Sequence, residues 1–476
     1  MPPSVSLRVA ATAAIALATT IGVTRAQGTR IDIAAVDRVV EAFRQKNRVP
    51  GMAVVITRNR DVVHVAGYGT DSRGAAITGK TRLPIASLSK SFTALAVMQL
   101  VEAGRVNLDA SVRDYLRDFS VADPRGATIT VRQLLTHTSG LADTTFPEKS
   151  GPLPGSLRDG VALLRTATLT GDPGSKAHYH NPNYWVAARI VEVVSGMSFL
   201  DYLQRHIFAP LGMVSSTTTG SLREVPDLAI GHVRFFGIPI ALREPAWFLD
   251  GASGVVTTPE DLARWLIMQN NAGETADGMR IVSAASLQAM HEGLGWSMHG
   301  EGASLRVEHT GWLFTFTAHQ ILLPSRGYGI AVISNTGLGL APADSEVVAE
   351  TLVAMINGET PDPGYPVALI VDLCLLALLV LSAVLGVRAV ARARPWAIRH
   401  AHRSGWRNAL ALTPRLIPIA VLAALPATLS FIFGGRDASS LQMLYVTPSL
   451  IACLVVASVS GAAATAARAV HLRRAR

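Results

Sequence analysis

The sequence predicts a mixed α/β domain, in which helices flank one antiparallel sheet and a helical insertion interrupts it, followed by an all-α transmembrane region. Strand-like runs of apolar residues occur near both ends of the first 360 residues, at 51–67 and 304–334. The segment between them reads mostly as helix and loop. Strands from both ends are therefore expected to share one sheet, with the middle of the domain as an insertion. The C-terminal third is strongly apolar.

The individual elements follow from apolar spacing. A helix is expected at 33–47, and two strands at 51–56 and 62–67 read as a hairpin around a polar turn. A helix is also expected at 87–103, because leucines and a phenylalanine recur there at helical spacing and a glycine follows. Further helices are expected at 184–194, 199–206, 259–270 and 343–356, and further strands at 304–308, 315–323 and 329–334.

The C-terminal third predicts a membrane domain at 361–476, preceded by an exported domain at 28–360. A helix of about 20 apolar residues crosses a bilayer core of roughly 30 Å. Buried core helices are the alternative, but arginine-rich or very short links separate the apolar stretches, which favours membrane spans. The three predicted spans lie at about 367–387, 416–435 and 444–467.

The charge distribution predicts an orientation and excludes one class of partner. Residues 361–476 carry twelve arginines, three aspartates and neither Lys nor Glu, which accounts for the whole formal net charge of +9. No basic face is left on the exported domain to support nucleic-acid binding. The arginines gather in the link between the first two spans and in the tail, and cytoplasmic loops attract arginines. We expect a multi-pass protein of the cytoplasmic (inner) membrane, with the domain at 28–360 on the periplasmic or extracellular side and the tail in the cytoplasm.

The N-terminus fits this orientation. In residues 1–26, Arg8 precedes a short Ala-rich apolar run that resembles the core of a signal peptide, and an uncleaved N-terminal anchor is the alternative. Both cysteines, Cys374 and Cys453, fall in predicted spans. The exported domain therefore has no thiolate nucleophile and no cysteine-based metal site.

A candidate nucleophile begins the helix at 87–103. A spacing of three residues places Ser87 and Lys90 on one helix face. The lysine can accept a serine proton only as a neutral amine, which requires its pKa to fall about 3 units below the usual value near 10.4. The chain has 38 arginines but five lysines, and Lys90 is the only one with a serine three positions earlier. An N-cap serine beside a solvated lysine is the structural alternative.

Two further motifs follow in order along the chain. The only Y-x-N motif comprises Tyr179 and Asn181. A tyrosine near the serine can relay a proton to a leaving group, and an asparagine can hold a substrate amide. An H-T-G motif at 309–311 follows a strand-like segment, and its glycine would let the backbone approach a substrate closely. Each motif alone also fits an ordinary structural role, so the prediction depends on the ordered set.

With these motifs the chain resembles the serine β-lactamase and penicillin-binding-protein superfamily, in its class C-like, DD-peptidase and esterase branch, from about residue 33 to 357. The segments 134–141, 181–184, 210–213 and 253–256 contribute to the resemblance. It implies a β-lactamase/transpeptidase-like fold, with no cofactor and no metal.

The resemblance also implies roles for individual residues. Ser87 would be the acylated nucleophile, Lys90 its proton acceptor and Tyr179 the proton shuttle. The backbone N–H groups of Ser87 and Trp312 would form the oxyanion hole, whereas His137 reads as structural. The expected substrate-binding residues are Asn181, His309, Thr310 and Gly311.

The sequence departs from the β-lactamase pattern at one position. No Lys-Thr-Gly occurs, so His309 replaces the lysine that usually faces a substrate carboxylate. An imidazole is mostly neutral near pH 7, which weakens recognition of penicillins. Such variants in this family are more like esterases, amidases and D-amino-acid peptidases. The layout, with an exported domain before three spans, is similar to that of the colibactin-maturing peptidase and its relatives, which remove an acyl-D-amino-acid cap.

The prediction is therefore a membrane-anchored serine hydrolase that cleaves an amide or ester of a small molecule or peptide through an acyl-enzyme. The lipid bilayer is the expected partner, and the spans could also pair two copies of the chain. Alternatives are a penicillin-binding DD-carboxypeptidase or weak β-lactamase, and a non-catalytic exported ligand-binding sensor. A metallohydrolase and an α/β-hydrolase are disfavoured, because neither H-E-x-x-H nor G-x-S-x-G occurs.

Overall fold

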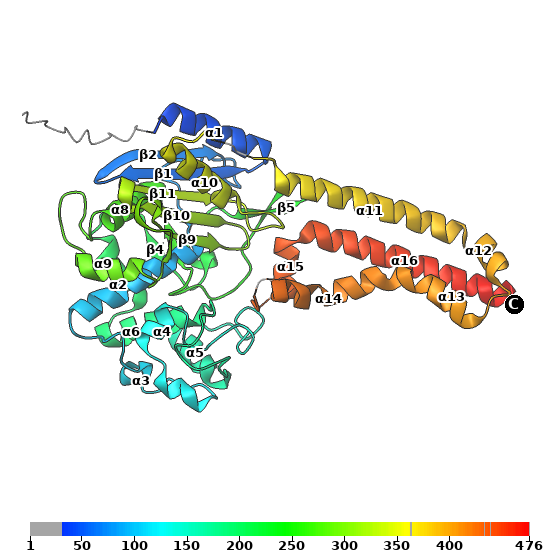
Figure 1. Ribbon diagram of the computed structural model, residues 1–476, viewed down its shortest axis with the longest axis horizontal. Coiled ribbons are helices and arrows are strands. Elements are labelled where there is room, and N and C mark those ends of the chain that lie inside the picture. The colour runs from blue at the N-terminus through cyan, green and yellow to red at the C-terminus, as the bar shows by residue number, and fades with distance from the viewer. Residues whose placement is uncertain (1–30, 362–363, 433, 438, 476) are drawn as a thin grey trace, which may run out of the picture.

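A six-stranded antiparallel sheet forms the centre of the first domain in the computed structural model, which describes residues 31–361, 364–432, 434–437 and 439–475. The strand order is β2-β1-β11-β10-β9-β8, and β1 pairs with β11, so both ends of the domain share one sheet as predicted (Figure 1). The proposed signal peptide lies outside the described residues. The strands are β1 (Gly51–Arg58), β2 (Asp61–Gly69), β8 (Ser297–His299), β9 (Arg306–Trp312), β10 (Thr317–Leu323) and β11 (Tyr328–Ser334).

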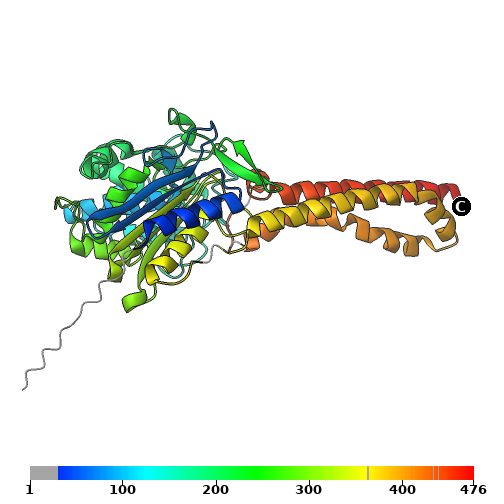
Figure 2. The same ribbon diagram turned by 90° about the horizontal axis from the view of Figure 1, so that it is seen from above.

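The sheet separates two hydrophobic cores, and alternate residues of its central strands point into one core or the other. Val54 and Ile56 pack with α1 (Ile33–Lys46) and α10 (Asp344–Asn357), which lie side by side along one face of the sheet (Figure 2). Val55 points to the opposite face and belongs to the larger core beneath. This division follows from the two-residue period of a strand, which sends successive side chains to opposite faces.

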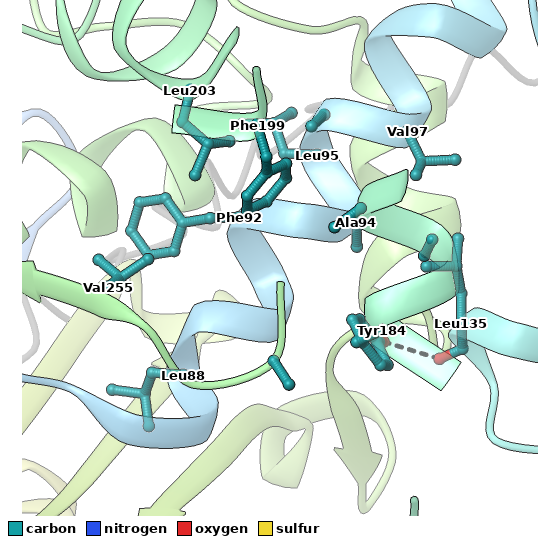
Figure 3. Close-up of a cluster of buried hydrophobic side chains, with 14 of the residues drawn as sticks. Leu88, Phe92, Ala94, Leu95, Val97, Leu135, Tyr184, Phe199, Leu203 and Val255 are labelled. Atoms are coloured by element: carbon teal, nitrogen blue, oxygen red, sulfur yellow. Dashed lines mark hydrogen bonds between the residues drawn. The ribbon is translucent and has the colours of Figure 1, made fainter. Parts of the chain in front are cut away.

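The central helix of the larger core is α2 (Ser89–Glu102), which follows the 3₁₀ turn η1 (Ala86–Leu88). The sequence predicts one continuous helix from 87, whereas the structure has this tighter turn first. Most side chains of α2 are buried. One of them, Phe92, stacks on Trp265 with ring centroids 3.7 Å apart. Figure 3 shows other core residues around α2, including Tyr184, whose hydroxyl donates to the backbone oxygen of Leu135 at 2.8 Å. The site described below therefore rests on a fully packed helix.

The middle of the domain is mostly helical, as predicted, with short strands that the sequence analysis did not anticipate. A small sheet has the order β3-β7-β4, and β5 pairs with β6 as a separate hairpin. The helices are α3 (Val112–Tyr115), α4 (Val131–Leu135), α5 (Leu157–Leu163), α6 (Pro182–Ser195), α7 (Phe199–Leu203), α8 (Pro259–Asn270) and α9 (Ala284–His291). The added strands are β3 (Leu83–Pro84), β4 (Thr217–Thr218), β5 (Gly231–Phe235), β6 (Ile238–Leu242) and β7 (Val255–Thr257).

Two elements near the candidate site and in the helical middle end at different residues than predicted. The strand expected at 304–308 is β9, which runs on to Trp312, because pairing with β10 continues as far as Trp312 opposite Thr317. The H-T-G motif therefore lies inside the strand rather than after it. The helix expected at 199–206 ends earlier, at Leu203, and continues as a π-helical turn over Gln204–Phe208.

The C-terminal region is a bundle of helices that extends away from the α/β domain (Figure 1). Among the residues that the structure describes, three helical segments are long and apolar enough to cross a membrane: Val367–Ala391, Gly405–Ile432 and Pro448–Ala475. The last begins later than expected, because Pro448 starts a new helix and the residues before it form a separate one. The helices are α11 (Val367–Ala391), α12 (Ala393–His400), α13 (Gly405–Leu412), α14 (Ile417–Ile432), α15 (Ser440–Val446) and α16 (Pro448–Ala475).

Small residues bring two of these helices together. A Cβ on Gly386 of α11 would lie 2.5 Å from the Cβ of Ser460 on α16, so the helices approach too closely for a larger side chain. Such contacts between small residues are typical of helix association in membranes, where backbones gain dispersion energy by close approach. The apolar helices thus form a packed unit.

Candidate active site

Ser87 lies in a strained turn between β3 and α2. The preceding Ala86 has a φ of 52°, a left-handed conformation that costs a non-glycine residue on the order of 1–3 kcal/mol. Ser89 stabilises the turn, because its Oγ donates to the oxygen of Ala86 at 2.6 Å and accepts from the nitrogen of Val255 at 3.0 Å. The Ser87 side chain lines a cavity at the start of α2, where the helix N-terminus favours negative charge.

Lys90 lies directly beneath Ser87 and is fully buried. Its Nζ is 3.1 Å from the Oγ of Ser87, 2.8 Å from the Oδ1 of Asn181 and 3.0 Å from the backbone oxygen of Ala252. A neutral amine has two N–H donors and one lone pair. The two carbonyl oxygens can accept the two N–H bonds, which leaves the lone pair facing the Ser87 hydroxyl.

The surroundings of Lys90 favour this neutral form. Burial holds the pKa of Lys90 well below its usual value, since a charged amine loses its hydration there. The negative charge of Glu148 opposes this effect, and the positive charges of Arg436 and Lys149 add to it. The requirement that the sequence analysis placed on this lysine is therefore met in direction.

Tyr179 covers Lys90 from the cavity side. The Lys90 Nζ is 4.8 Å from the centroid of the Tyr179 ring, and the His137 ring packs on the same tyrosine at 4.4 Å. Although 38% of Tyr179 is exposed to the cavity, the loss of hydration there raises its pKa to about 12. Interaction with the Ser87 side chain and the charge of Arg436 oppose this shift. The phenol is therefore protonated near pH 7 and can donate.

Asn181 connects Lys90 to a buried carboxylate. Its Oδ1 accepts from Lys90, and its Nδ2 donates to the Oε1 of Glu148 at 2.7 Å. These two bonds orient the amide, because reversing it would place like groups together. Asn181 also lines the cavity, in keeping with the predicted contact to substrate, but its main partners are protein groups.

The strand β9 passes beside the turn that holds Ser87. A Cβ on Gly311 would lie 2.7 Å from the backbone oxygen of Ile85, so only glycine allows this approach. His309, Thr310 and Trp312 line the cavity, whereas Gly311 packs against the turn. Burial lowers the pKa of His309 to about 4, which leaves the imidazole neutral at pH 7 even beside an uncharged Lys90.

Arg436 is a residue of this site that the sequence analysis did not identify. It comes from the link between α14 and α15, and its guanidinium lies 5.0 Å from the Tyr179 ring centroid. It also donates to the backbone oxygen of Tyr179 and forms ion pairs with Asp143 and Glu148, each at 3.3 Å. Its position 257 residues after Tyr179 in the chain gave no local signal; its isolation between two apolar spans was the only hint.

The residues around Arg436 form a balanced charge network. Asp143, Glu148 and His180 offer possible metal-ligand atoms within 4.8 Å of one another. Lys149 and Arg436 already pair with both carboxylates, and burial lowers the pKa of His180, which favours a neutral ring. The donor set therefore suits an internal ion-pair network better than a divalent cation.

These groups meet at one cavity of about 390 Å³. It is lined by Ser87, Tyr179, Asn181, His309, Thr310 and Trp312 from the predicted set, while Lys90 lies below its floor. A volume of this size suits a small-molecule or short-peptide substrate.

Comparison with known families agrees with this arrangement. The Beta-lactamase family model matches residues 36–354. The chain belongs to the β-lactamase family. Most of the α/β domain is therefore that of a β-lactamase-related protein, and the family in general consists of serine hydrolases and DD-peptidases.

Individual relatives of this β-lactamase-family chain extend the comparison. Penicillin-binding protein 4 of Amycolatopsis lactamdurans is 30% identical over 321 residues, covering 63% of this chain and 84% of that protein. Protein flp of Staphylococcus aureus (strain MW2) is 26% identical over 385 residues, covering 77% of this chain and 75% of that protein. The solved octameric penicillin-binding protein homologue from Pyrococcus abyssi aligns with a TM-score of 0.61 at 25% identity, over 73% of this chain and 81% of that one.

Proposed function

We propose that the protein is a membrane-anchored serine hydrolase that cleaves an amide or ester through an acyl-enzyme on Ser87. One observation carries the proposal. The buried amine of Lys90 has carbonyl acceptors for two N–H bonds and faces the Ser87 hydroxyl at 3.1 Å. This is the arrangement of a general base beside its nucleophile.

The first half of the reaction forms the acyl-enzyme. Lys90 takes the proton of Ser87 as Oγ attacks the substrate carbonyl carbon, and the carbonyl oxygen becomes negatively charged. The N–H groups of Ser87 and Trp312 would stabilise that oxygen; removing one such donor costs ~10²–10³ in rate elsewhere. Tyr179, which stays protonated because its pKa is about 12, donates a proton to the departing amine or alkoxide and is reprotonated from Lys90. The carbon–heteroatom bond then breaks.

The second half consumes one water molecule. Neutral Lys90, directly or through Tyr179, accepts a proton from the water as its oxygen attacks the acyl carbon. The Ser87 oxygen leaves and recovers that proton, which releases a carboxylic acid and restores the enzyme. The reaction needs no oxidant, reductant or second substrate.

The site favours esters and amides without a free carboxylate over penicillins. A pKa of about 4 leaves His309 neutral, so it supplies no charge where β-lactamases usually have a lysine. The second candidate, a DD-carboxypeptidase or weak β-lactamase, is favoured by the relationship to penicillin-binding protein 4. Side-by-side assays with p-nitrophenyl esters, N-acyl-D-amino-acid amides and nitrocefin distinguish the two.

Covalent labelling tests the proposal directly. The full chain in detergent is treated with a fluorophosphonate and analysed by intact-mass spectrometry. We expect one adduct, located at Ser87 by peptide mapping and absent from Ser87→Ala, which should also lose turnover by ~10⁴ or more. Ser89→Ala is the matched control, because Ser89 holds the turn but points away from the cavity. A folded wild-type protein that stays unlabelled would contradict the proposal and favour an idle sensor.

A further inference from the structure

The active-site cavity crosses from the α/β domain into the membrane domain. One end contains Ser87 and the residues around it, and the other end is built by α14 and α15. Since α14 is the end of the span Gly405–Ile432, the cavity touches a membrane helix itself. The residues at this far end are Leu429, Gln442, Met443 and Val446.

The wall between the two ends is apolar. Trp247, Trp312, Leu313, Phe314 and Leu338 line it, and Phe314 packs between the rings of Trp247 and Tyr445 at 5.3 and 5.4 Å. The charged lining residues lie on the Tyr179 side, where Arg436 and Lys149 are already paired with buried carboxylates. The cavity thus has a polar end at Ser87 and a mainly apolar end at the spans, where Gln442 is the polar exception and its Oε1 accepts from the nitrogen of Ser439 at 2.7 Å.

A neighbouring hairpin indicates where the bilayer surface lies. At the turn between β5 and β6, Phe236 N donates to the Oγ of Ser449 on α16 at 2.9 Å, and Gly237 N donates to Asp372 on α11 at 2.7 Å. Figure 2 shows this green hairpin reaching the domain-proximal ends of the membrane helices. Ile238 and Ile240 are 55% and 42% exposed there, which suits contact with lipid. Leu429 lies three residues before the end of α14, about 5 Å along the helix.

The membrane side of the cavity is held firmly on the α/β domain. The carboxylate of Asp437 accepts from the nitrogens of Lys149 and Ser150 at 2.9 and 2.7 Å. Its own nitrogen donates to Asp143 at 2.7 Å, and the Tyr445 hydroxyl donates to the oxygen of Arg243 at 2.8 Å. These bonds fix α15 as part of the cavity wall.

We propose that the substrate is an amphiphile: an amide or ester whose carbonyl lies at Ser87 and whose aliphatic chain occupies the apolar end formed by α14 and α15. The bilayer would be its source, because Leu429 lines the apolar end and belongs to a helical segment that is long and apolar enough to lie within the leaflet. This inference rests on the proposed function and adds the substrate class to it.

Chain length is the property to measure. The full-length protein in detergent is assayed with acetyl, butanoyl, hexanoyl and octanoyl esters of p-nitrophenol. We expect kcat/KM to rise with length, by up to ~4-fold for each buried methylene, until the cavity is filled. Alkyl fluorophosphonates of increasing chain length give the same comparison as rates of Ser87 labelling. A rate independent of chain length in both series would overturn the inference.

Two variants at Val446 test where the aliphatic chain of the substrate binds. Val446→Trp fills the apolar end, so the ratio of octanoyl to acetyl kcat/KM should fall by about tenfold or more, and Val446→Ala should move the optimum to a longer chain. Leu441→Trp is the matched control, because Leu441 lies on the same helix, is 47% exposed and does not line the cavity. The inference is rejected if the ratio of octanoyl to acetyl kcat/KM is unchanged in the folded Val446 variants, or falls equally in the Leu441 variant. Either result would mean that the aliphatic chain of the substrate binds elsewhere.

Two further experiments distinguish a failure of substrate delivery from the bilayer from a failure of the proposed reaction at Ser87. In vesicles, an octanoyl amide embedded in the same bilayer as the protein should be cleaved faster than one supplied in separate vesicles, and equal rates would contradict delivery from the leaflet. Absence of labelling by every fluorophosphonate would instead contradict the proposed function itself, whereas labelling without chain preference contradicts only the amphiphile.

Discussion

At the scale of single residues, the proposed mechanism depends on keeping the Lys90 amine neutral. Lys90 lies among carbonyl acceptors and aromatic rings, and within the part of the chain that the structure describes no carboxylate pairs with it directly. Glu148 is connected to it only through the Asn181 amide. A direct ion pair would hold the proton on the amine and remove its basicity. The intervening amide therefore lets a buried carboxylate organise the site without disabling the base.

Lys90→Arg tests this basicity. A guanidinium keeps the positive charge but does not lose its proton near neutral pH, so kcat should fall by ~10³–10⁴, nearly as far as in Ser87→Ala. Steady-state ester hydrolysis measures the change, and circular dichroism checks that the variant is folded. Wild-type turnover in Lys90→Arg would show that Lys90 is a structural cation.

Arg436→Gln tests the charge that reaches the site from the membrane domain. The positive charge of Arg436 lowers the pKa of Lys90, so its removal should raise that pKa. The proposed mechanism requires the neutral amine, and the rising limb of kcat/KM against pH should therefore move to higher pH. Arg436→Lys keeps the charge and is the control. An unshifted limb in Arg436→Gln would limit the arginine to a structural contact.

At the scale of elements, two close approaches shape the cavity. At Gly311 the strand β9 touches the turn that holds Ser87, and Glu244 ties down the loop that follows this strand. The buried Glu244 carboxylate accepts from the nitrogens of Phe314 and Thr315 at 2.8 and 3.1 Å and from the Thr315 hydroxyl at 2.6 Å. Backbone position, rather than side-chain identity alone, thus sets the shape of the apolar wall.

Gly311→Ala should push β9 away from the turn. The added Cβ would lie 2.7 Å from the Ile85 oxygen, and a backbone atom cannot move aside as a side-chain tip can. We expect a loss of stability of about 1–3 kcal/mol, typical of overpacking, together with a lower kcat/KM. Thermal unfolding and ester hydrolysis measure the two effects. Gly339→Ala is the control for stability, because no atom lies within 4 Å of the added carbon and the backbone there is outside the left-handed region.

Glu244→Gln tests the buried carboxyl through pH. Burial raises the pKa of Glu244 from 4.5 to about 7, so the folded protein holds a proton that the unfolded chain releases above pH 4.5. The stabilisation linked to this proton is complete below pH 4.5 and is lost as pH rises through 7, a change on the order of 3 kcal/mol. The melting temperature of Glu244→Gln relative to wild type should therefore rise between pH 5 and 8. A constant difference would refute the shift.

At the scale of the whole molecule, the C-terminal helical region completes the candidate site. The link between α14 and α15 places Arg436 on Tyr179 and joins Asp437 to the backbone after Glu148. The helices long and apolar enough to cross a membrane therefore also belong to the candidate site, since they supply part of the cavity wall.

Asp437→Ala tests this coupling. Loss of the carboxylate frees the link from Lys149 and Ser150, so Arg436 should lose its position and kcat/KM should fall by about tenfold. In the double variant with Arg436→Gln, the effects of the two substitutions on kcat/KM should be less than additive, because both residues act through one contact network. A double-mutant cycle on ester hydrolysis measures this. Full additivity would show that the two residues act independently.

The sequence by itself determined the main helices and strands, the proximity of Ser87 to Lys90 and the apolar C-terminal helices. Periodicity placed α1, α8 and the strands from both ends of the sheet, because burial on one face imposes regular apolar spacing. The predicted proximity of Ser87 and Lys90 is confirmed, because residues one helical turn apart are neighbours whatever surrounds them. The apolar length of the C-terminal segments likewise identified helices able to cross a membrane.

Only the tertiary structure decided which distant groups meet. The buried partners of Lys90, the Ala86 turn and the arrival of Arg436 depend on contacts between segments up to hundreds of residues apart, for which local spacing carries no signal. Strand β9 also extends further than its apolar pattern, because pairing with β10 supplies its hydrogen bonds. Chemistry that lies within one helical turn can be read from the chain, whereas a cavity shared by two domains is fixed by how they pack.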